Sequence, residues 1–310
     1  MAEQIRSVII SGGTGLIGKA LSRRLVAEGK QVRILTRDAA GRKADPGVEL
    51  VEWDGRTTAG WLEQLEGVDA VVHLAGANLG GSPWTAKRRQ LIVSSRVESG
   101  QALVQAVRTV SQRPRVLIQA SAVGYYGDSE EAEFTEDDPP GKGWLPEVCT
   151  AWEAATREVE DLGLRRVIIR TGLVLDREEG LLPTMALPVR TGAGGPIGNG
   201  RQWMSWIHRE DEVNAILSLL ENDSAVGAYN LTAPHPRRNT DFVRALAGVL
   251  HRPYWLPAPA FAVRAVLGKM SDLALKGQNV QPKRLEEAGF HFDYPDLTAA
   301  LADLYGNPVI

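Results

Sequence analysis

Glycines are concentrated near the start of the chain, where residues 11–18 read Ser-Gly-Gly-Thr-Gly-Leu-Ile-Gly. Gly13, Gly15 and Gly18 satisfy the spacing G-x-G-x-x-G, and Gly12 with the last two satisfies a looser G-x-x-G-x-x-G. An early glycine makes a tight turn, Gly15 lets the backbone approach a diphosphate, and Gly18 lets a helix pack against a strand. The alternative is that this segment forms only a tight turn and binds no phosphate. The apolar run before the segment and the amphipathic run after it favour a phosphate-binding loop at a helix N-terminus.

The end of the next apolar run bears on the choice of nucleotide, because an NAD site usually places a carboxylate there for the ribose 2′-hydroxyl. This chain has Thr36-Arg37-Asp38 at that point, with Arg42 and Lys43 nearby. Arg37 can bind a 2′-phosphate through charge-assisted hydrogen bonds. The alternative is that Arg37 is solvated and Asp38 binds the ribose. We predict NADP(H) as the cofactor.

Three hydroxyl groups follow a later apolar run and are candidates for proton transfer: Ser121, Tyr125 and Tyr126. They stand where a parallel strand would end, which is where ligands bind in open α/β sheets. One of them could donate a proton to a carbonyl oxygen, and packing in a turn is an equally good interpretation of Tyr126. We predict Ser121, Tyr125 and Tyr126 as the catalytic residues.

Other side chains have less specific interpretations. Glu153 could carry protons but fits a helix surface better, and Cys149 fits a buried position because no histidine is near it in sequence. Trp203 and Trp206 could line a pocket, although core packing is the commoner use of tryptophan. His208 and Asp211 favour a structural hydrogen bond at a helix start over a catalytic pair.

Short β-branched runs alternate with amphipathic runs over the first half of the chain, which predicts a parallel, doubly wound α/β sheet. The predicted strands are Val8–Ser11, Gln31–Thr36, Val48–Glu52, Asp69–Ala75, Arg115–Ser121 and Arg165–Thr171. The predicted helices are Leu16–Glu28, Thr85–Thr109 and Pro146–Leu162. The last two could also cover a dimer interface, so a monomer and a homodimer both remain open.

The pattern changes after Asp176, where a glycine-rich loop, 191–200, is followed by helical segments separated by prolines. We expect a Rossmann domain over residues 1–175, completed by 206–232. Residues 176–205 and 233–310 would form a smaller, mostly helical lobe on the substrate side. The elements predicted after Asp176 are Glu210–Glu221, Ala228–Thr232, Asp241–Leu250, Ala260–Leu267, Pro282–Ala288 and Asp296–Leu304.

Composition excludes several classes of protein. The 310 residues carry a formal net charge of −3, which gives no reason to expect nucleic acid or an acidic membrane surface as a partner. A single cysteine cannot form an intramolecular disulfide, so a reducing, cytoplasmic location is expected. No apolar stretch reaches the length of a membrane span, and the five histidines lack the spacing of metal ligands.

Several motifs together resemble those of the extended short-chain dehydrogenase/reductase superfamily. They are the glycine loop, His73-Leu74-Ala75-Gly76 and the segment 121–127, Ser-Ala-Val-Gly-Tyr-Tyr-Gly. Further motifs occur in order and narrow the match: Ser94–Val97, Glu147–Glu153, Arg170–Leu175, Gly198–His208, and Pro282–Leu285 followed by Ala288–Phe290. With them the chain resembles the atypical epimerase-like subgroup that has a C-terminal domain of unknown function, the 39U type.

The resemblance implies a set of cofactor-binding residues. Gly12, Thr14, Gly15, Leu16 and Ile17 match the phosphate loop, and Thr36 and Arg37 match the 2′-phosphate side. The strand end that passes beneath the cofactor is matched by Leu74, Ala75 and Gly76. Arg96 matches a cofactor-side position on the long helix, and Thr171 and Leu173 match the nicotinamide side.

The catalytic pair of the superfamily, Tyr-x-x-x-Lys, is not matched. Val148 stands in the tyrosine position and Trp152 in the lysine position, and neither side chain titrates. The usual serine position holds Ala122, with Ser121 one residue earlier. Two hypotheses follow: an NADP(H)-dependent oxidoreductase of unusual mechanism acting on a small carbonyl or hydroxyl compound, or a non-catalytic NADP(H)-binding redox sensor.

Overall fold

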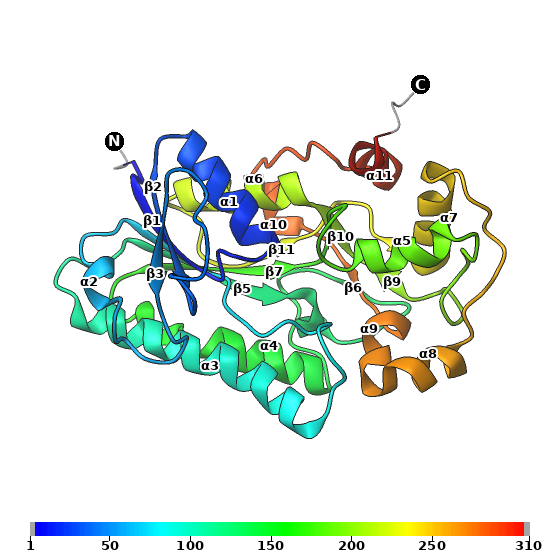
Figure 1. Ribbon diagram of the computed structural model, residues 1–310, viewed down its shortest axis with the longest axis horizontal. Helices are drawn as coiled ribbons and strands as arrows, with labels where there is room; N and C mark the ends of the chain where they lie inside the picture. Colours follow the sequence, from blue (N-terminus) through cyan, green and yellow to red (C-terminus); the bar gives the residue numbers. More distant parts are fainter. Residues whose placement is uncertain (1–3, 307–310) are drawn as a thin grey trace.

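The computed structural model describes residues 4–306 and is built around one sheet of seven parallel strands (Figure 1). The strand order is β11-β7-β5-β4-β1-β2-β3. The strands are β1 (Ser7–Ser11), β2 (Gln31–Thr36), β3 (Val48–Glu52), β4 (Ala70–His73), β5 (Val116–Ala122), β7 (Arg165–Thr171) and β11 (Gly227–Leu231). The predicted doubly wound parallel α/β fold is confirmed, and each predicted strand is present within two residues of its bounds.

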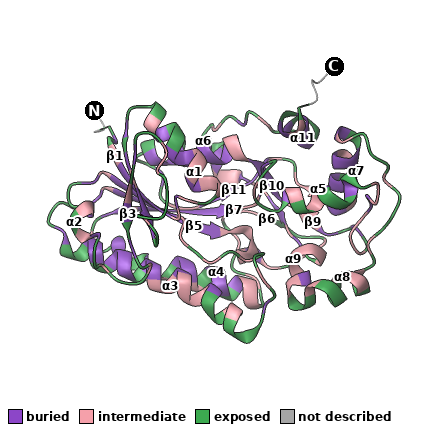
Figure 2. Ribbon diagram, viewed as in Figure 1, coloured by how far each residue is buried: buried purple, intermediate pink, exposed green. Residues whose placement is uncertain are grey.

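Helices cover both faces of the sheet. On one face lie α1 (Leu16–Ala27) and α6 (Arg209–Glu221); on the other lie α2 (Leu62–Leu65), α3 (Ala86–Thr109) and α4 (Trp144–Ala154) (Figure 1). The strands contribute alternate side chains to two apolar cores, one on each face: Ile10 packs with Leu21 and Leu25, and Ile9 packs with Leu103 and Val107. Because both faces are covered, most residues of the inner strands are buried, as Figure 2 shows, whereas the edge strand β3 has two exposed residues.

The predicted helix Pro146–Leu162 is wrong in its extent. α4 begins earlier, at Trp144, and ends at Ala154, after which a short 3₁₀ turn covers Arg157–Val159. The backbone carbonyl of Glu153 accepts a hydrogen bond of 2.8 Å from the Arg166 guanidinium, and the Thr156 hydroxyl donates to Gln119 on β5. These contacts draw the chain onto the sheet, so the helix cannot continue.

A second group of elements packs beside the carboxyl edge of the sheet. It contains α5 (Leu182–Arg190), α7 (Asn239–Val249), α8 (Ala260–Leu267), α9 (Asp272–Leu275) and α11 (Leu297–Tyr305). Another helix, α10 (Lys283–Glu287), packs against β11, and its Leu285 belongs to the core of the sheet. Three two-stranded pairs link the second group to the sheet: β8 (Leu173–Leu175) with β10 (Trp206–His208), β9 (Trp203–Met204) with β12 (Arg237–Arg238), and β6 (Glu133–Phe134) with β13 (Asn279–Val280). A separate apolar core around Trp206 and Phe242 holds α5, α7 and α11 together, which supports the lobe boundary that we propose.

The sequence analysis missed α5, because Pro183 and Pro188 lie in it. Pro183 stands in its first turn, where the missing N–H costs nothing, and Pro188 lies near its end. No helix within residues 4–306 is long and apolar enough to cross a membrane.

Candidate functional site

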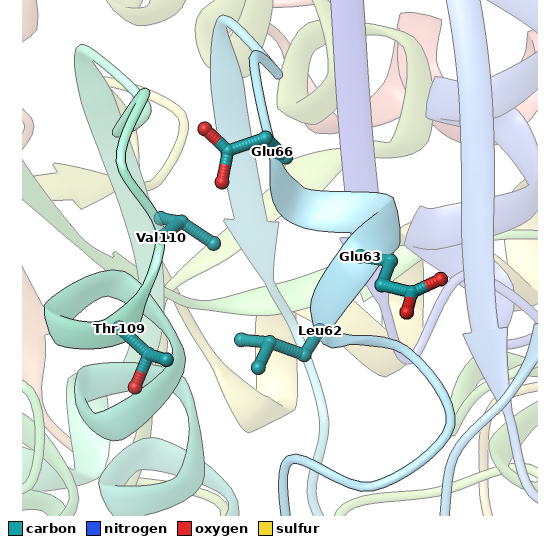
Figure 3. A pocket seen from close by; sticks show the side chains of 5 residues that line it. All are labelled: Leu62, Glu63, Glu66, Thr109 and Val110. Atoms are coloured by element: carbon teal, nitrogen blue, oxygen red, sulfur yellow. The ribbon is translucent and has the colours of Figure 1, made fainter.

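Two hollows in the described part of the chain are candidates for a site. A small one, of about 360 Å³, lies between α2 and the C-terminal end of α3 and is lined by Leu62, Glu63, Glu66, Thr109 and Val110 (Figure 3). The Glu66 carboxylate accepts hydrogen bonds there from the backbone N–H groups of Ser111 and Gln112. This hollow lies at the amino edge of the sheet. Parallel α/β sheets bind ligands at the carboxyl edge, so it is not the candidate site.

The other hollow is a cavity of about 1190 Å³ between the carboxyl edge of the sheet and the lobe. Arg96, Thr171 and Leu173, all predicted cofactor residues, line one end of it. The sheet also reverses its strand order here, since the chain runs outward from β1 to β3 in one direction and from β4 to β11 in the other. Such a switch point is where dinucleotides bind in doubly wound sheets.

The glycine loop joins β1 to α1 and is shaped for a phosphate. Gly12 has φ +72°, and a Cβ there would lie 2.7 Å from the Leu74 carbonyl carbon. A Cβ at Gly18 would lie 2.4 Å from Gly13 Cα, so Gly18 lets α1 pack against the loop itself. Gly15 differs, because its Cβ would meet only the Gly12 carbonyl oxygen, at 3.5 Å. Its free side therefore leaves the space that a diphosphate requires.

The N-terminus of α1 has no side-chain cap. Gly15 is the residue before the helix, and the first backbone hydrogen bond back to it comes from Lys19. The first N–H groups of the helix, on Leu16 and Ile17, thus point toward the open side of Gly15, where a negative charge would be stabilised by them and by the helix dipole. The loop fits a diphosphate group on this geometry.

The predicted cofactor residues lie in spatial order along the carboxyl edge. Arg37, Gly12 and Leu74 follow directly after the neighbouring strands β2, β1 and β4, and Thr171 is the last residue of β7, which lies beyond β5. This order is the order in which the 2′-phosphate, the diphosphate and the nicotinamide follow one another in an extended NADP molecule. Residues that are spread over 160 positions of the sequence are thereby brought into one row along the edge of the sheet, which we call the cofactor track.

At one end of the track Arg37 is exposed, and Thr36 before it is buried. The Asp38 carboxylate instead accepts a hydrogen bond of 2.9 Å from the Gly41 backbone N–H. That bond directs the carboxylate into its own loop, which weighs against Asp38 as a ribose ligand. Arg37 has no ion pair within residues 4–306, so its guanidinium is available for a 2′-phosphate.

In the middle of the track, Arg96 of α3 reaches the segment after β4. Its guanidinium donates to the carbonyl oxygens of Ala77, at 3.0 Å, and Ile92, at 2.9 Å. A Cβ at Gly76 would lie 3.0 Å from its guanidinium carbon, so the two predicted residues are in contact. Burial lowers the pKa of Arg96 to about 10, which leaves it charged at neutral pH.

At the other end of the track, the Thr171 hydroxyl donates a hydrogen bond of 2.8 Å to Glu212 Oε1. Glu212 lies on α6 and has no exposed surface, and burial raises its pKa to about 8. Its other oxygen has no hydrogen-bond partner in the part of the chain that the structure describes. Sequence analysis did not single out Glu212, because a carboxylate in the first turn of a helix is ordinarily a solvated one.

The structure does not bring the hydroxyls of the three predicted catalytic residues together in the cavity. The Ser121 hydroxyl donates to Glu153 Oε1 at 2.6 Å, and the Tyr126 hydroxyl donates to Asn230 Oδ1 at 2.7 Å. Arg170 links the two groups, because it donates to both Glu153 oxygens at 3.0 Å and to the Tyr126 hydroxyl at 3.0 Å. Burial raises the pKa of Tyr126 to about 12. This chain of contacts ties β5, α4, β7 and β11 together.

Glu153 therefore has a different position from the exposed helix surface that its sequence context suggested. It is 9% exposed and forms a buried, two-bond ion pair with Arg170. Tyr125 lies outside the hydrogen-bonded chain: the Arg170 guanidinium stacks on its ring at 3.4 Å, and its hydroxyl has no hydrogen bond to any residue of 4–306. Its sequence neighbours Gly124 and Gly127 line the cavity.

Residues of α4 form a wall that the sequence analysis did not foresee as a site. Trp144, Val148 and Trp152 line the cavity, and Trp144 packs edge-to-face on Trp84 with ring centroids 4.6 Å apart. The Arg96 guanidinium lies 4.6 Å above the Trp152 ring. Val148 and Trp152, the residues in place of the usual tyrosine and lysine, thus supply an apolar face.

The remaining candidates divide between the cavity and the cores. Trp203 lines the cavity, whereas Trp206 is fully buried in the core of the lobe. Cys149 is buried as predicted, and burial raises the pKa of its thiol to about 12.

The expected hydrogen bond between His208 and Asp211 is absent. His208 Nδ1 accepts from the Glu210 backbone N–H, and Asp211 accepts from the backbone N–H groups of Asp293 and Tyr294. Residues 4–306 contain no group of three side chains that could hold a metal ion.

Comparison with known proteins identifies the family. A model of the NAD dependent epimerase/dehydratase family matches residues 8–232, and a model of a domain of unknown function, DUF1731, matches residues 258–304. The epimerase family protein YfhF of Bacillus subtilis is 40% identical over 302 residues, which cover 97% of this chain and 98% of the relative. A chloroplastic SDR39U1 homolog of Arabidopsis thaliana is 38% identical, with 96% and 86% of the two chains covered.

Solved structures agree with this. The human epimerase family protein SDR39U1, crystallised with NADPH, is 34% identical and superimposes with a TM-score of 0.87 over 97% of this chain and 99% of that one. UDP-glucose 4-epimerase of Thermus thermophilus, at 19% identity and a TM-score of 0.76 over 98% and 100% of the two chains, shares the fold. The chain therefore belongs to the NAD dependent epimerase/dehydratase family and, within it, to the SDR39U1-like epimerase family proteins with a C-terminal DUF1731 region.

Proposed function

We propose that this protein binds NADP(H) along the carboxyl edge of its sheet and acts as an NADP(H)-dependent oxidoreductase. The observation that carries the proposal is the track of Arg37, Gly12–Gly15, Leu74–Gly76 and Thr171 on neighbouring strand ends, leading into the cavity. The NADPH in the human homologue's crystal structure supports the same cofactor.

Each part of the chain would have a separate task. The α1 N-terminus and Gly15 would hold the diphosphate, and Arg37 would hold the 2′-phosphate. Arg96, Thr171 and Leu173 would position the nicotinamide end at the mouth of the cavity. Bound NADPH supplies a hydride, so the substrate is a compound with a reducible carbonyl, or in the reverse direction a hydroxyl group.

A proton must reach the carbonyl oxygen when the hydride reaches its carbon. Of the three predicted hydroxyl groups, Ser121 and Tyr126 are engaged in the buried chain of contacts to Glu153, Arg170 and Asn230. Tyr125 has no such bond within residues 4–306. It does not itself line the cavity, but Gly124 before it and Gly127 shortly after it do. We therefore propose Tyr125 as the proton donor.

The test has two stages. Calorimetric titration of the folded protein should show NADPH binding more tightly than NADH. Oxidation of NADPH should then be followed at 340 nm with a panel of carbonyl compounds. The Tyr125→Phe variant should lower turnover and leave NADPH affinity unchanged. Failure to bind either nucleotide would overturn the whole proposal.

A second candidate, a redox sensor that binds NADP(H) without turnover, is favoured by one observation. Val148 and Trp152 replace the titratable pair with an apolar wall, so these two positions of α4 offer no proton carrier. NADPH binding without oxidation by any member of the panel, together with different protease sensitivity of the NADP⁺ and NADPH complexes, would favour the sensor.

A further inference from the structure

The cavity continues well beyond the nicotinamide end of the track, and the chemistry of its walls bears on the substrate. From the end that Thr171 and Arg96 line, the cavity extends to α5, α8 and α9 of the lobe. Resting on the proposed function, we infer that this part of the cavity takes an elongated, mainly apolar carbonyl compound that bears one anionic group.

The walls of the lobe are apolar. Met185 and Val189 come from α5, Val263 and Val266 from α8, and Leu273 from α9. α8 is unusual, since none of its eight residues is buried, although seven are apolar or alanine. Val266 is 82% exposed. An apolar helix without protein cover at the edge of a cavity would gain burial from an apolar ligand.

Several polar groups of the lobe that line the cavity are already used within the protein, although the Gln202 amide oxygen has no hydrogen-bond partner among the described residues. Gln202 donates to the carbonyl oxygens of Ile197 and Ala274, and Ser205 donates to that of Gln278. Asn239 accepts from the Ile197 backbone N–H through its amide oxygen. A sugar ring presents hydroxyl groups on all sides and loses affinity when they find no partner. These walls therefore offer few partners to a polyhydroxylated substrate.

The charges around the cavity favour an anion. Its lining contains five cationic residues and two acidic ones, in a chain whose net charge is −3: Arg89, Arg96, Lys142, Lys269 and Lys276, with Asp128 and Asp272. Both acids are engaged, Asp128 by the Gly277 backbone N–H at 2.9 Å and Asp272 by Lys276 at 3.1 Å. Lys142 and Lys269 are exposed and have no ion pair within residues 4–306. They can bind an anionic group beside the apolar walls.

The experiment compares three probes by calorimetry, on the protein alone and on the protein saturated with NADPH: dodecanoate, dodecanol and UDP-glucose. Dodecanoate should bind more tightly than the other two. The double variant Lys142→Gln/Lys269→Gln should weaken dodecanoate binding about tenfold and leave dodecanol binding unchanged, since two exposed ion pairs are lost. Lys87→Gln, an exposed lysine of α3 outside the lining, is the matched control and should change nothing.

A second variant tests the apolar wall. Val266→Asp should weaken dodecanoate binding more than tenfold without lowering the Tm, because the side chain packs on little protein. Val226→Asp, at an exposed valine remote from the cavity, is its control. Tighter binding of UDP-glucose than of dodecanoate, or unchanged dodecanoate binding in both variants, would overturn the inference. NADPH affinity is read separately, so a chain that binds dodecanoate but no nucleotide would refute the proposed function alone.

Discussion

The Thr171 hydroxyl donates a hydrogen bond of 2.8 Å to Glu212, a carboxyl group with no exposed surface at the end of the cofactor track. Burial raises the pKa of Glu212 from 4.5 to about 8. Between these values the folded state binds more protons than the unfolded state, so the free energy of unfolding falls as the pH rises from about 4.5 to about 8.

The Glu212→Gln variant should lack this part of the pH dependence, because glutamine accepts the Thr171 bond without titrating. We expect it to be more stable than the parent above pH 8, by an amount on the order of 5 kcal/mol, and closely similar near pH 5. Urea unfolding at pH 5.5, 7.0 and 8.5 measures the difference. Glu63→Gln, an exposed carboxyl, serves as the control. Parallel pH profiles for the parent and Glu212→Gln would contradict the prediction.

The Gly15→Ala substitution should weaken NADPH binding and leave the stability of the fold nearly unchanged. Its Cβ would meet only the Gly12 carbonyl oxygen at 3.5 Å and would fill the space beside the α1 N-terminus. We expect a Tm within about 2 °C of the parent and at least a tenfold loss of NADPH affinity, measured by calorimetry. Gly248→Ala, in α7 with nothing within 4 Å of its Cβ, should lower neither the Tm nor the NADPH affinity. Unimpaired NADPH binding by Gly15→Ala would place the diphosphate elsewhere.

Arg37→Ala should weaken NADPH binding about ten- to a hundredfold and leave NADH binding nearly unchanged, since only NADPH carries the 2′-phosphate. The loss should shrink as salt concentration rises, because Arg37 is exposed. Arg108→Ala removes another exposed guanidinium, at the C-terminal end of α3 where it pairs with Glu158, and controls for net charge. If both nucleotides lost affinity equally, the 2′-phosphate assignment would be incorrect.

Tyr126→Phe should lower the free energy of unfolding. It removes the hydroxyl that accepts from Arg170 and donates to Asn230, so both buried groups lose a partner. The expected loss is about 1–3 kcal/mol in the free energy of unfolding. Tyr125→Phe should leave this free energy unchanged, because its hydroxyl has no such bond among the described residues. Urea unfolding of both variants provides the comparison, and equal destabilisation would show that the two tyrosines share one structural role.

Local patterns were enough to predict the sheet and one half of the site. The β-branched runs are set by neighbours in sequence, and the predicted strands agree with the structure. The glycine spacing of 12–18 and the position of Arg37 are equally local features, and their roles in cofactor binding stay predictions. The end of α4 was missed because Arg166 and Gln119, both remote in sequence, compete for its backbone and side chains. Helix propensity carries no information on such partners.

The amino-acid sequence alone determined the fold class, the glycine loop and the family resemblance, because these depend on short-range periodicity and on glycines at fixed spacing. Only the tertiary structure decided which polar groups are free. It turned Ser121 and Tyr126 toward Glu153, Arg170 and Asn230, buried Glu212 behind Thr171, and placed an uncovered α8 beside the cavity. Burial and hydrogen-bond partners come from segments far apart in the chain, and they set the chemistry of a side chain as much as its type does.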